Sequence, residues 1–78
     1  MIPQPQEIWQ HYRTKGKYEI VALGKLQTKI ETLDMQECVI YKAMSDEKIW
    51  VRPLVDFTEE IIDEKGNTVK RFEKQTSR

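Results

Sequence analysis

The chain has 78 residues and a formal net charge of zero, with 38% hydrophobic and 33% charged side chains. This length allows one domain with a small core, and the balanced composition excludes an intrinsically disordered chain. No apolar run reaches the roughly 18 residues of a membrane helix, and the start of the chain lacks the pattern of a secretory signal. The single cysteine, Cys38, excludes an intrachain disulfide and favours a reducing, cytoplasmic location.

The neutral total hides an uneven distribution of charge along the chain. Residues 1–30 carry five basic and two acidic side chains, residues 31–64 carry three basic and ten acidic ones, and residues 65–78 carry five basic and one acidic. A fold that brings the two ends together would therefore have a basic face opposite an acidic one.

The first half of the chain contains one segment of ambiguous pattern followed by two segments with the pattern of strands. Residues 7–13 fit both helical spacing and strand alternation, so periodicity leaves their structure open. The stretch 13–17 reads as a turn in which Gly16 can take positive φ. In 18–26, Tyr18, Ile20, Ala22 and Leu26 alternate with a second face, and Gly24 suggests a bulge or bend. After a polar connection at 27–34, the segment 37–44 is partly apolar on both faces, as in a central strand.

The second half begins with a tight turn at 44–48 and a short strand at 48–52 that ends before Pro53. Residues 56–65 remain ambiguous, because DFTE matches a helix capping box and EEIIDE-KGN-TVKRF also reads as a hairpin with Gly66-Asn67 as its turn. We expect one short helical turn at 53–58, then the hairpin. The ordered part of this single domain is expected to cover 7–73, with flexible ends at 1–6 and 74–78.

The order of several short segments resembles the bacterial domain-of-unknown-function family 1653. These segments are HYR, YEIVALG, ET, VIYKAM, WVRPLVDF and a terminal RF, and the resemblance covers about residues 8 to 73. The resemblance implies an all-β, SH3-like barrel of about five antiparallel strands with one short helical turn after Pro53, and it places residues 7–13 in the opening strand. The biochemical activity of that family is uncharacterised, so the resemblance implies a fold and no reaction.

The strand KIWVR carries the main candidate site. Alternation places Ile49 and Val51 on one face and Trp50 and Arg52 on the other, and it leaves open which pair is buried. If Ile49 and Val51 face the core, Trp50 and Arg52 form a platform outside it. An aromatic ring beside a guanidinium can stack on ligands and bind carboxylates or phosphates. The alternative is structural: Arg52 pairs with Glu31 or Asp56, and the N-terminal segment covers Trp50.

Further candidates are weaker. His11 is the only histidine, and with one cysteine it forms no recognised zinc pattern, so neither a metal nor a cofactor is expected. An enzyme built on His11 and Glu31 is the least favoured alternative. Cys38 is expected to be a buried, unreactive residue. A basic patch could form between the first turn and the last strand, from Arg13, Lys15, Lys17, Lys70, Arg71 and Lys74.

These patterns favour a non-catalytic binding module for a peptide, a protein or a nucleic acid. The ligand-binding candidates are His11, Tyr12, Glu31, Tyr41, Trp50 and Arg52. This function rests on fold analogy, because loops on a rigid barrel commonly carry binding sites. The alternative is a structural subunit that associates with itself, as a homodimer for example.

Overall fold

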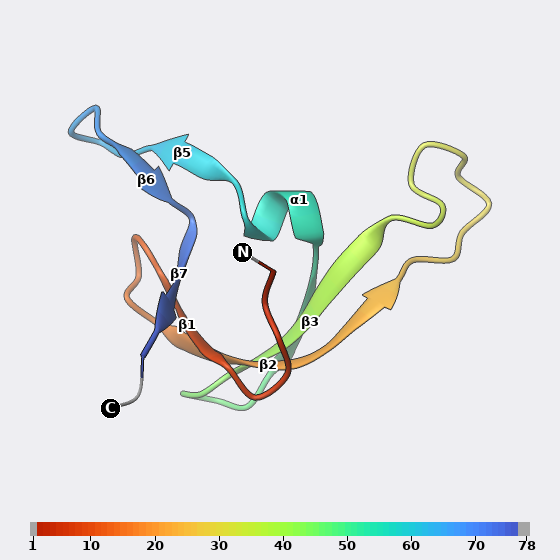
Figure 1. Cartoon of the computed structure of the whole chain (residues 1–78), viewed down its shortest axis with the longest axis horizontal. Helices are drawn as coiled ribbons and strands as arrows, with labels where there is room; N and C mark the ends of the chain where they lie inside the picture. Colours follow the sequence, from red (N-terminus) through yellow and green to blue (C-terminus); the bar gives the residue numbers. More distant parts are fainter. Residues whose placement is uncertain (1, 77–78) are drawn as a thin grey trace.

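The computed structural model describes residues 2–76, which form a strongly curved antiparallel sheet, a separate hairpin and one short helix (Figure 1). The main sheet has the order β4-β3-β2-β1-β7. Its strands are β1 (Ile8–His11), β2 (Lys17–Lys25), β3 (Glu37–Ala43), β4 (Ile49–Pro53) and β7 (Phe72–Gln75). Helix α1 (Leu54–Phe57) follows β4, and β5 (Glu60–Ile62) pairs with β6 (Thr68–Lys70).

This architecture confirms the predicted small all-β domain with a short helical turn after Pro53, and it makes 8–11 a strand. Within residues 2–76 the sheet does not close on itself, because β4 pairs only with β3 and β7 pairs only with β1. The two edge strands therefore flank an opening, and α1 lies over the concave face between them (Figure 1).

A bulge in β2 changes which residues face inward. The pairing of β2 with β3 shifts register between Ile20 and Ala22, so Ile20 lies opposite Tyr41 while Ala22 lies opposite Ile40. The extra residue, Val21, reverses the alternation beyond it. Of the bulge or bend suggested at Gly24, the bulge is therefore not found there, and the prediction that Ala22 shares the face of Ile20 was wrong.

The β1–β2 and β5–β6 turns differ in how well the sequence predicted which residue takes positive φ. In the β1–β2 turn we expected Gly16 to take positive φ, but the residue that does so is Lys15, at 64°. In the β5–β6 turn Gly66 does take positive φ, 86°, as the Gly66-Asn67 pattern predicts. There the Asp63 carboxylate accepts hydrogen bonds from the backbone N–H groups of Lys65 and Asn67, at 2.9 and 2.8 Å.

The region after Pro53 forms the expected helical turn without the capping box. Helix α1 has Pro53 at its N-cap and no side-chain cap, and Asp56 lies inside the helix. The Thr58 hydroxyl instead donates to the Leu54 carbonyl at 3.0 Å. Within residues 2–76 no helix is long and apolar enough to cross a membrane.

Residues near both ends of the described range pack against the rest of the domain. The predicted hairpin strand TVKRF, residues 68–72, is interrupted at Arg71, so β6 pairs with β5 and β7 pairs with β1. Lys74 and Gln75, expected in the flexible tail, lie opposite Trp9 and Ile8 in that pairing. Near the start of the chain, Pro3 is buried. The rest of the expected tail, at 77–78, lies outside the described residues.

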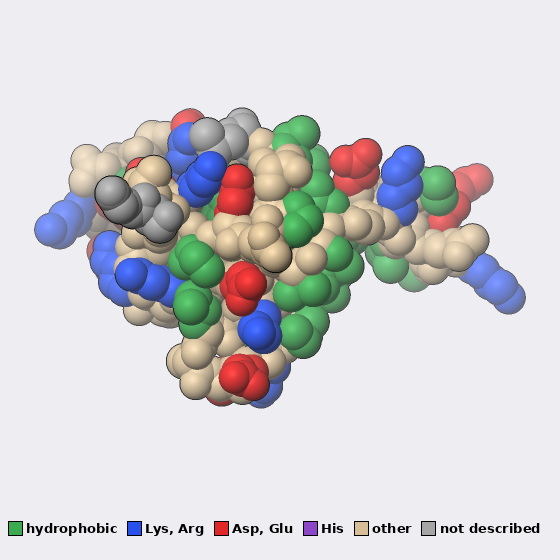
Figure 2. Space-filling view, turned by 60° about the horizontal axis from the view of Figure 1, so that its bottom comes forward, with side chains coloured by type: hydrophobic (Ala, Val, Ile, Leu, Met, Phe, Trp, Pro, Cys, Tyr) green, Lys and Arg blue, Asp and Glu red, His purple; other side chains and the backbone are tan. Residues whose placement is uncertain are grey.

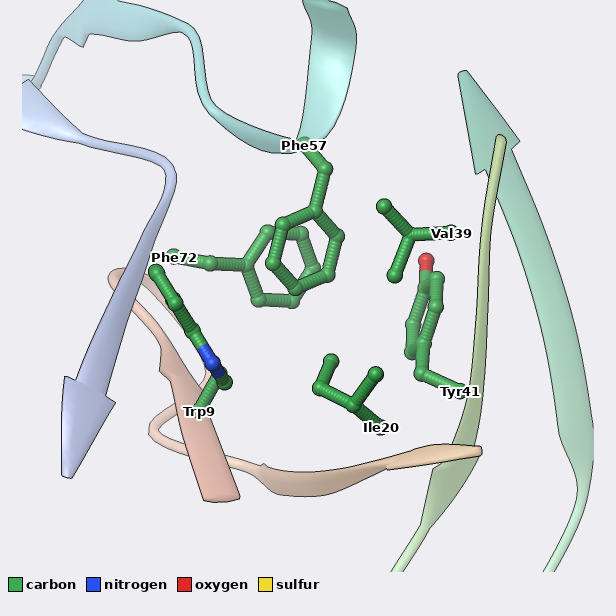
Figure 3. Close-up of a cluster of buried hydrophobic side chains, with 6 residues drawn as sticks. All are labelled: Trp9, Ile20, Val39, Tyr41, Phe57 and Phe72. Atoms are coloured by element: carbon green, nitrogen blue, oxygen red, sulfur yellow. The ribbon is translucent and has the colours of Figure 1, made fainter. Parts of the chain in front are cut away.

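The core is a cluster of six side chains on the concave face of the sheet: Trp9, Ile20, Val39, Tyr41, Phe57 and Phe72 (Figure 3). The rings of Phe57 and Phe72 stack with centroids 4.1 Å apart and planes 2° from parallel. Tyr41 meets both rings edge-on, at 5.3 and 5.6 Å. Phe57 thus fills the opening between the sheet edges and attaches α1 to the sheet.

We predict that Phe57→Ala lowers the free energy of unfolding by about 3–5 kcal/mol, because it removes a fully buried ring and leaves a cavity. A loss of this size can unfold so small a domain, so Phe57→Leu serves as the graded variant, with an expected loss of roughly 0.5–3 kcal/mol. Urea unfolding measures both.

Val55→Ala is the matched control, because Val55 lies on the same helical turn and is 70% exposed. It should change stability by no more than about 0.5 kcal/mol. Equal effects of the substitutions at positions 55 and 57 would contradict the role given to the stacked rings.

Candidate functional site

Trp50 and Arg52 lie on the concave side of the sheet, so they do not form a platform outside the core. Trp50 pairs with Tyr41 and Arg52 with Val39, and both partners are core residues. Cross-strand neighbours share a face, so Ile49 and Val51 point outward, where they are 52% and 63% exposed. The predicted alternation is confirmed, and the structure decides which of the two faces points inward.

A pocket of about 170 Å³ surrounds these two side chains. It lies at the end of the sheet where the β1–β2 and β3–β4 turns meet, since the Met44 N–H donates to the Lys17 carbonyl at 3.0 Å. We call it the Trp50–Arg52 pocket. It is lined by His11, Thr14, Tyr18, Tyr41, Trp50, Arg52 and Phe72.

The pocket brings together four of the six ligand-binding candidates: His11, Tyr41, Trp50 and Arg52. The lining does not include Tyr12 or Glu31. Sequence analysis missed Thr14, Tyr18 and Phe72 as lining residues. Tyr18 could have been found, because it lies two residues before the inward-facing Ile20 and so shares its face. Phe72 comes from the far end of the chain.

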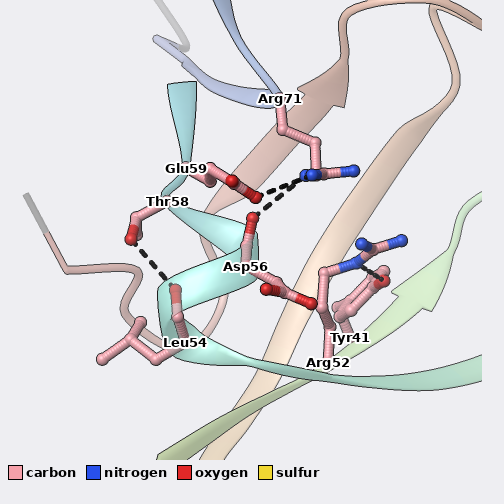
Figure 4. A network of polar contacts seen from close by, with 7 residues as sticks. All are labelled: Tyr41, Arg52, Leu54, Asp56, Thr58, Glu59 and Arg71. Atoms are coloured by element: carbon pink, nitrogen blue, oxygen red, sulfur yellow. Dashed lines mark hydrogen bonds and ion pairs between the residues drawn. The ribbon is translucent and has the colours of Figure 1, made fainter. Parts of the chain in front are cut away.

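Arg52 has a fixed orientation but no ionic partner. Its Nε donates to the Tyr41 hydroxyl at 3.2 Å, and its guanidinium carbon lies 5.6 Å from the centroid of the Phe72 ring (Figure 4). Within residues 2–76 it forms no ion pair, so the expected alternatives of pairing with Glu31 or Asp56 are not realised. Figure 4 marks no hydrogen bond or ion pair between Asp56 and Arg52.

Trp50 remains accessible in this arrangement. It is 47% exposed, so the N-terminal segment does not cover it as the structural alternative required. The Lys48 ammonium lies 5.9 Å from the centroid of its ring. Trp50 thus contributes an open aromatic wall at the mouth of the pocket.

His11 is held by its own turn. Its Nδ1 accepts hydrogen bonds from the backbone N–H groups of Arg13 and Thr14, at 3.2 and 3.5 Å. Burial lowers the pKa of His11 below its ordinary value, and the positive charges of Arg52, Arg71 and Arg13 lower it further. The neutral ring then carries its proton on Nε2, which is a hydrogen-bond donor.

The remaining candidates lie elsewhere. Glu31 is exposed in the β2–β3 connection, and neither of the two pockets that His11 lines includes it. Cys38 is buried, as predicted. Among residues 2–76, no group of three or more His, Cys, Asp or Glu side chains is placed to hold a metal ion.

The six basic-patch residues are mixed with carboxylates. Lys15 and Lys70 line a second pocket, of about 480 Å³, together with Glu60, Asp63 and Glu73. Arg71 forms an ion pair with Glu59 at 2.8 Å, and Lys74 forms one with Glu7 at 3.0 Å. In addition, Arg71 Nε donates to the Asp56 carbonyl at 3.1 Å (Figure 4). The contacts of Arg71 attach the β6–β7 corner to α1 and the residues that follow it. Within residues 2–76, Arg71 and Lys74 are the two members of the patch that form ion pairs.

Comparison with known proteins places the chain in a family. The model of a family described as a protein of unknown function, DUF1653, matches residues 7–74. The chain belongs to the DUF1653 family. The match spans β1 to β7 and includes every residue of the Trp50–Arg52 pocket. No curated protein matches the chain, and no solved structure does.

We predict that the His11 ring titrates below its ordinary pKa of about 6.5. Between the lowered folded-state value and the unfolded value, the unfolded chain binds more protons than the folded one. Stability should therefore fall as pH drops from about 7 through this window, with no further loss from His11 below the folded-state value. NMR titration of the ring and urea unfolding at the two ends of the window measure both effects.

Arg52→Gln tests what lowers the pKa of His11. Because burial is the larger contribution, this substitution should raise the pKa of His11 only part of the way to its ordinary value. A ring that titrates at or above 6.5 in the unsubstituted protein would contradict the assignment.

Proposed function

We propose that this domain is a non-catalytic binding module and that the Trp50–Arg52 pocket is its ligand site. The observation that carries the proposal is the combination of an accessible Trp50 with an Arg52 that has no ionic partner within residues 2–76. A guanidinium in a structural role is normally paired, because an uncompensated charge near a core contributes little stability.

The rigidity of the pocket also supports binding. Tyr41 and Phe72 belong at once to the buried core and to the pocket lining, so the walls are fixed before a ligand arrives. A preformed site loses little conformational entropy on binding. The ligand classes that suit an aromatic wall beside a guanidinium are peptides or proteins and single-stranded nucleic acids.

The test is a search that favours neither ligand class. Random peptides displayed on phage are selected against the purified domain, and mixed-sequence single-stranded DNA is titrated at low and moderate salt while amide chemical shifts are recorded. At least one class should bind, with shifts gathered at the residues that line the pocket. Trp50→Ala should weaken that binding about ten-fold or more, since one stacked group contributes roughly 1–3 kcal/mol.

Val55→Ala again serves as the control, because Val55 is exposed and lies outside the pocket lining. It should bind as the unsubstituted domain does. If neither ligand class moves the pocket resonances at millimolar concentration, or if both variants bind equally, the pocket is not a ligand site.

A second candidate function, self-association, is favoured by the apolar outer side of β4. Ile49 and Val51 are 52% and 63% exposed on an edge strand, and unprotected edge strands readily pair with other chains. Hydrophobic side chains gather along one face of the molecule in Figure 2, with charged side chains around them. An apolar edge of this kind suits a homodimer in which two copies of β4 meet.

If self-association is the function, sedimentation velocity should show a concentration-dependent dimer at micromolar protein, and Val51→Lys should abolish it because the charge would be buried in the interface. Glu60→Lys is a matched control, since it adds a lysine at an exposed position of the separate β5–β6 hairpin. A stable monomer across the concentration range removes this candidate.

A further inference from the structure

The lining of the Trp50–Arg52 pocket is rich in hydrogen-bond donors and contains no carboxylate. The donors are the guanidinium of Arg52, the indole N–H of Trp50, the Nε2–H of neutral His11 and the hydroxyls of Thr14, Tyr18 and Tyr41. Two of the hydroxyls already accept a hydrogen bond, from Arg52 at 3.2 Å and from the Gly16 N–H at 3.2 Å, so their protons remain available. Such a lining matches a ligand group that only accepts hydrogen bonds.

The geometry of Arg52 identifies the centre of this site. Its Nε is held by Tyr41 and its plane is packed near the Phe72 ring. The two terminal nitrogens donate no hydrogen bond to any residue in the described range 2–76. An oriented guanidinium with both terminal nitrogens free presents a fork that matches the two oxygens of a carboxylate.

The size of the pocket limits what this anion is attached to. A volume of about 170 Å³ lies below the roughly 300–1,000 Å³ of typical small-molecule and cofactor sites. It suits one side chain or one chain terminus, with Trp50 and Phe72 contacting the carbon atoms beside the charged group. A whole nucleotide would extend well beyond these walls.

The charges around the pocket favour a single negative group over a polyanion. Nucleic acids bind through several phosphate contacts, but Arg71 and Lys74 are already paired with Glu59 and Glu7. The lining itself contains one cation, Arg52, and no carboxylate. One free guanidinium matches one monovalent carboxylate.

We infer that the Trp50–Arg52 pocket binds a carboxylate of a peptide or protein partner, with Arg52 as the forked donor and Trp50 and Phe72 as apolar walls. This inference rests on the proposed binding function and names its ligand class. The carboxylate comes either from a chain terminus or from an acidic side chain, because both offer the same two oxygens.

Four probes test the inference and separate the two sources. They are N-acetyl-Gly-Phe as the free acid, the same dipeptide as its C-terminal amide, N-acetyl-Asp-Phe amide, and short mixed-sequence single-stranded DNA. Each is titrated into the full chain while amide shifts are followed. At least one carboxylate probe should shift the pocket resonances and bind about ten-fold or more tightly than the neutral amide, because charge-assisted hydrogen bonds are lost in the amide.

Substitutions at and near the pocket identify the group responsible. Arg52→Gln should remove the preference for the carboxylate, and Arg52→Lys should restore only part of it, because lysine keeps the charge without the fork. Arg13→Gln is the matched control: it removes one of the charges felt by His11 but lies outside the lining, and it should change affinity less than two-fold. Urea unfolding of each variant shows that the domain still folds.

The outcomes separate this inference from the broader function. A preference for the free acid identifies a chain terminus, and a preference for the aspartyl amide identifies an acidic side chain. If neither carboxylate probe binds more tightly than the neutral Gly-Phe amide, or if Arg52→Gln leaves carboxylate binding unchanged, the inference is overturned. Binding of the DNA alone also overturns it while leaving a binding module in place. Failure of all four probes overturns the carboxylate assignment, and the peptide and DNA searches described above then decide whether the pocket binds any ligand.

Discussion

The face-to-face contact between Phe57 and Phe72 is the interaction on which the rest of this domain depends. Phe72 comes from the last strand and Phe57 from the only helix within residues 2–76, and their rings lie 4.1 Å apart. The main sheet is open between β4 and β7, so no backbone pairing joins its two edges. Stacked rings join them instead, and a domain of this size has few other apolar side chains with which to do so.

The same aromatic cluster makes the candidate site. Tyr41 and Phe72 are core residues on one side and pocket walls on the other, and Tyr41 also fixes Arg52 through its hydroxyl. Stability and binding therefore share side chains here. Trp50 and Arg52, in contrast, line the pocket without belonging to the buried cluster, so we expect substitutions at these two positions to separate binding from folding.

Much of the fold could be predicted from the sequence, because its strands alternate clearly and Pro53 marks the end of β4. The family resemblance resolved residues 7–13, whose periodicity alone was ambiguous. The orientation of β4 could not be predicted, since alternation separates two faces without saying which one is buried. The bulge at Val21 left no sequence signal, and Gly24, the more conspicuous residue, lies in regular pairing with Cys38. Four site residues were anticipated from their chemistry, but Phe72 joins them only through the pairing of the first strand with the last.

That pairing has a consequence for how the chain acquires its structure. Strand β1 lies between β2 and β7, so its second partner is separated from it by nearly the whole chain. Contacts between residues so distant in sequence form late, because closing a long loop costs entropy before the contact forms. During synthesis, β1 to β4 leave the ribosome with a concave face that lacks both Phe57 and Phe72. Because Phe72 belongs to both the core and the pocket lining, we expect both to be completed only when the C-terminal strand docks.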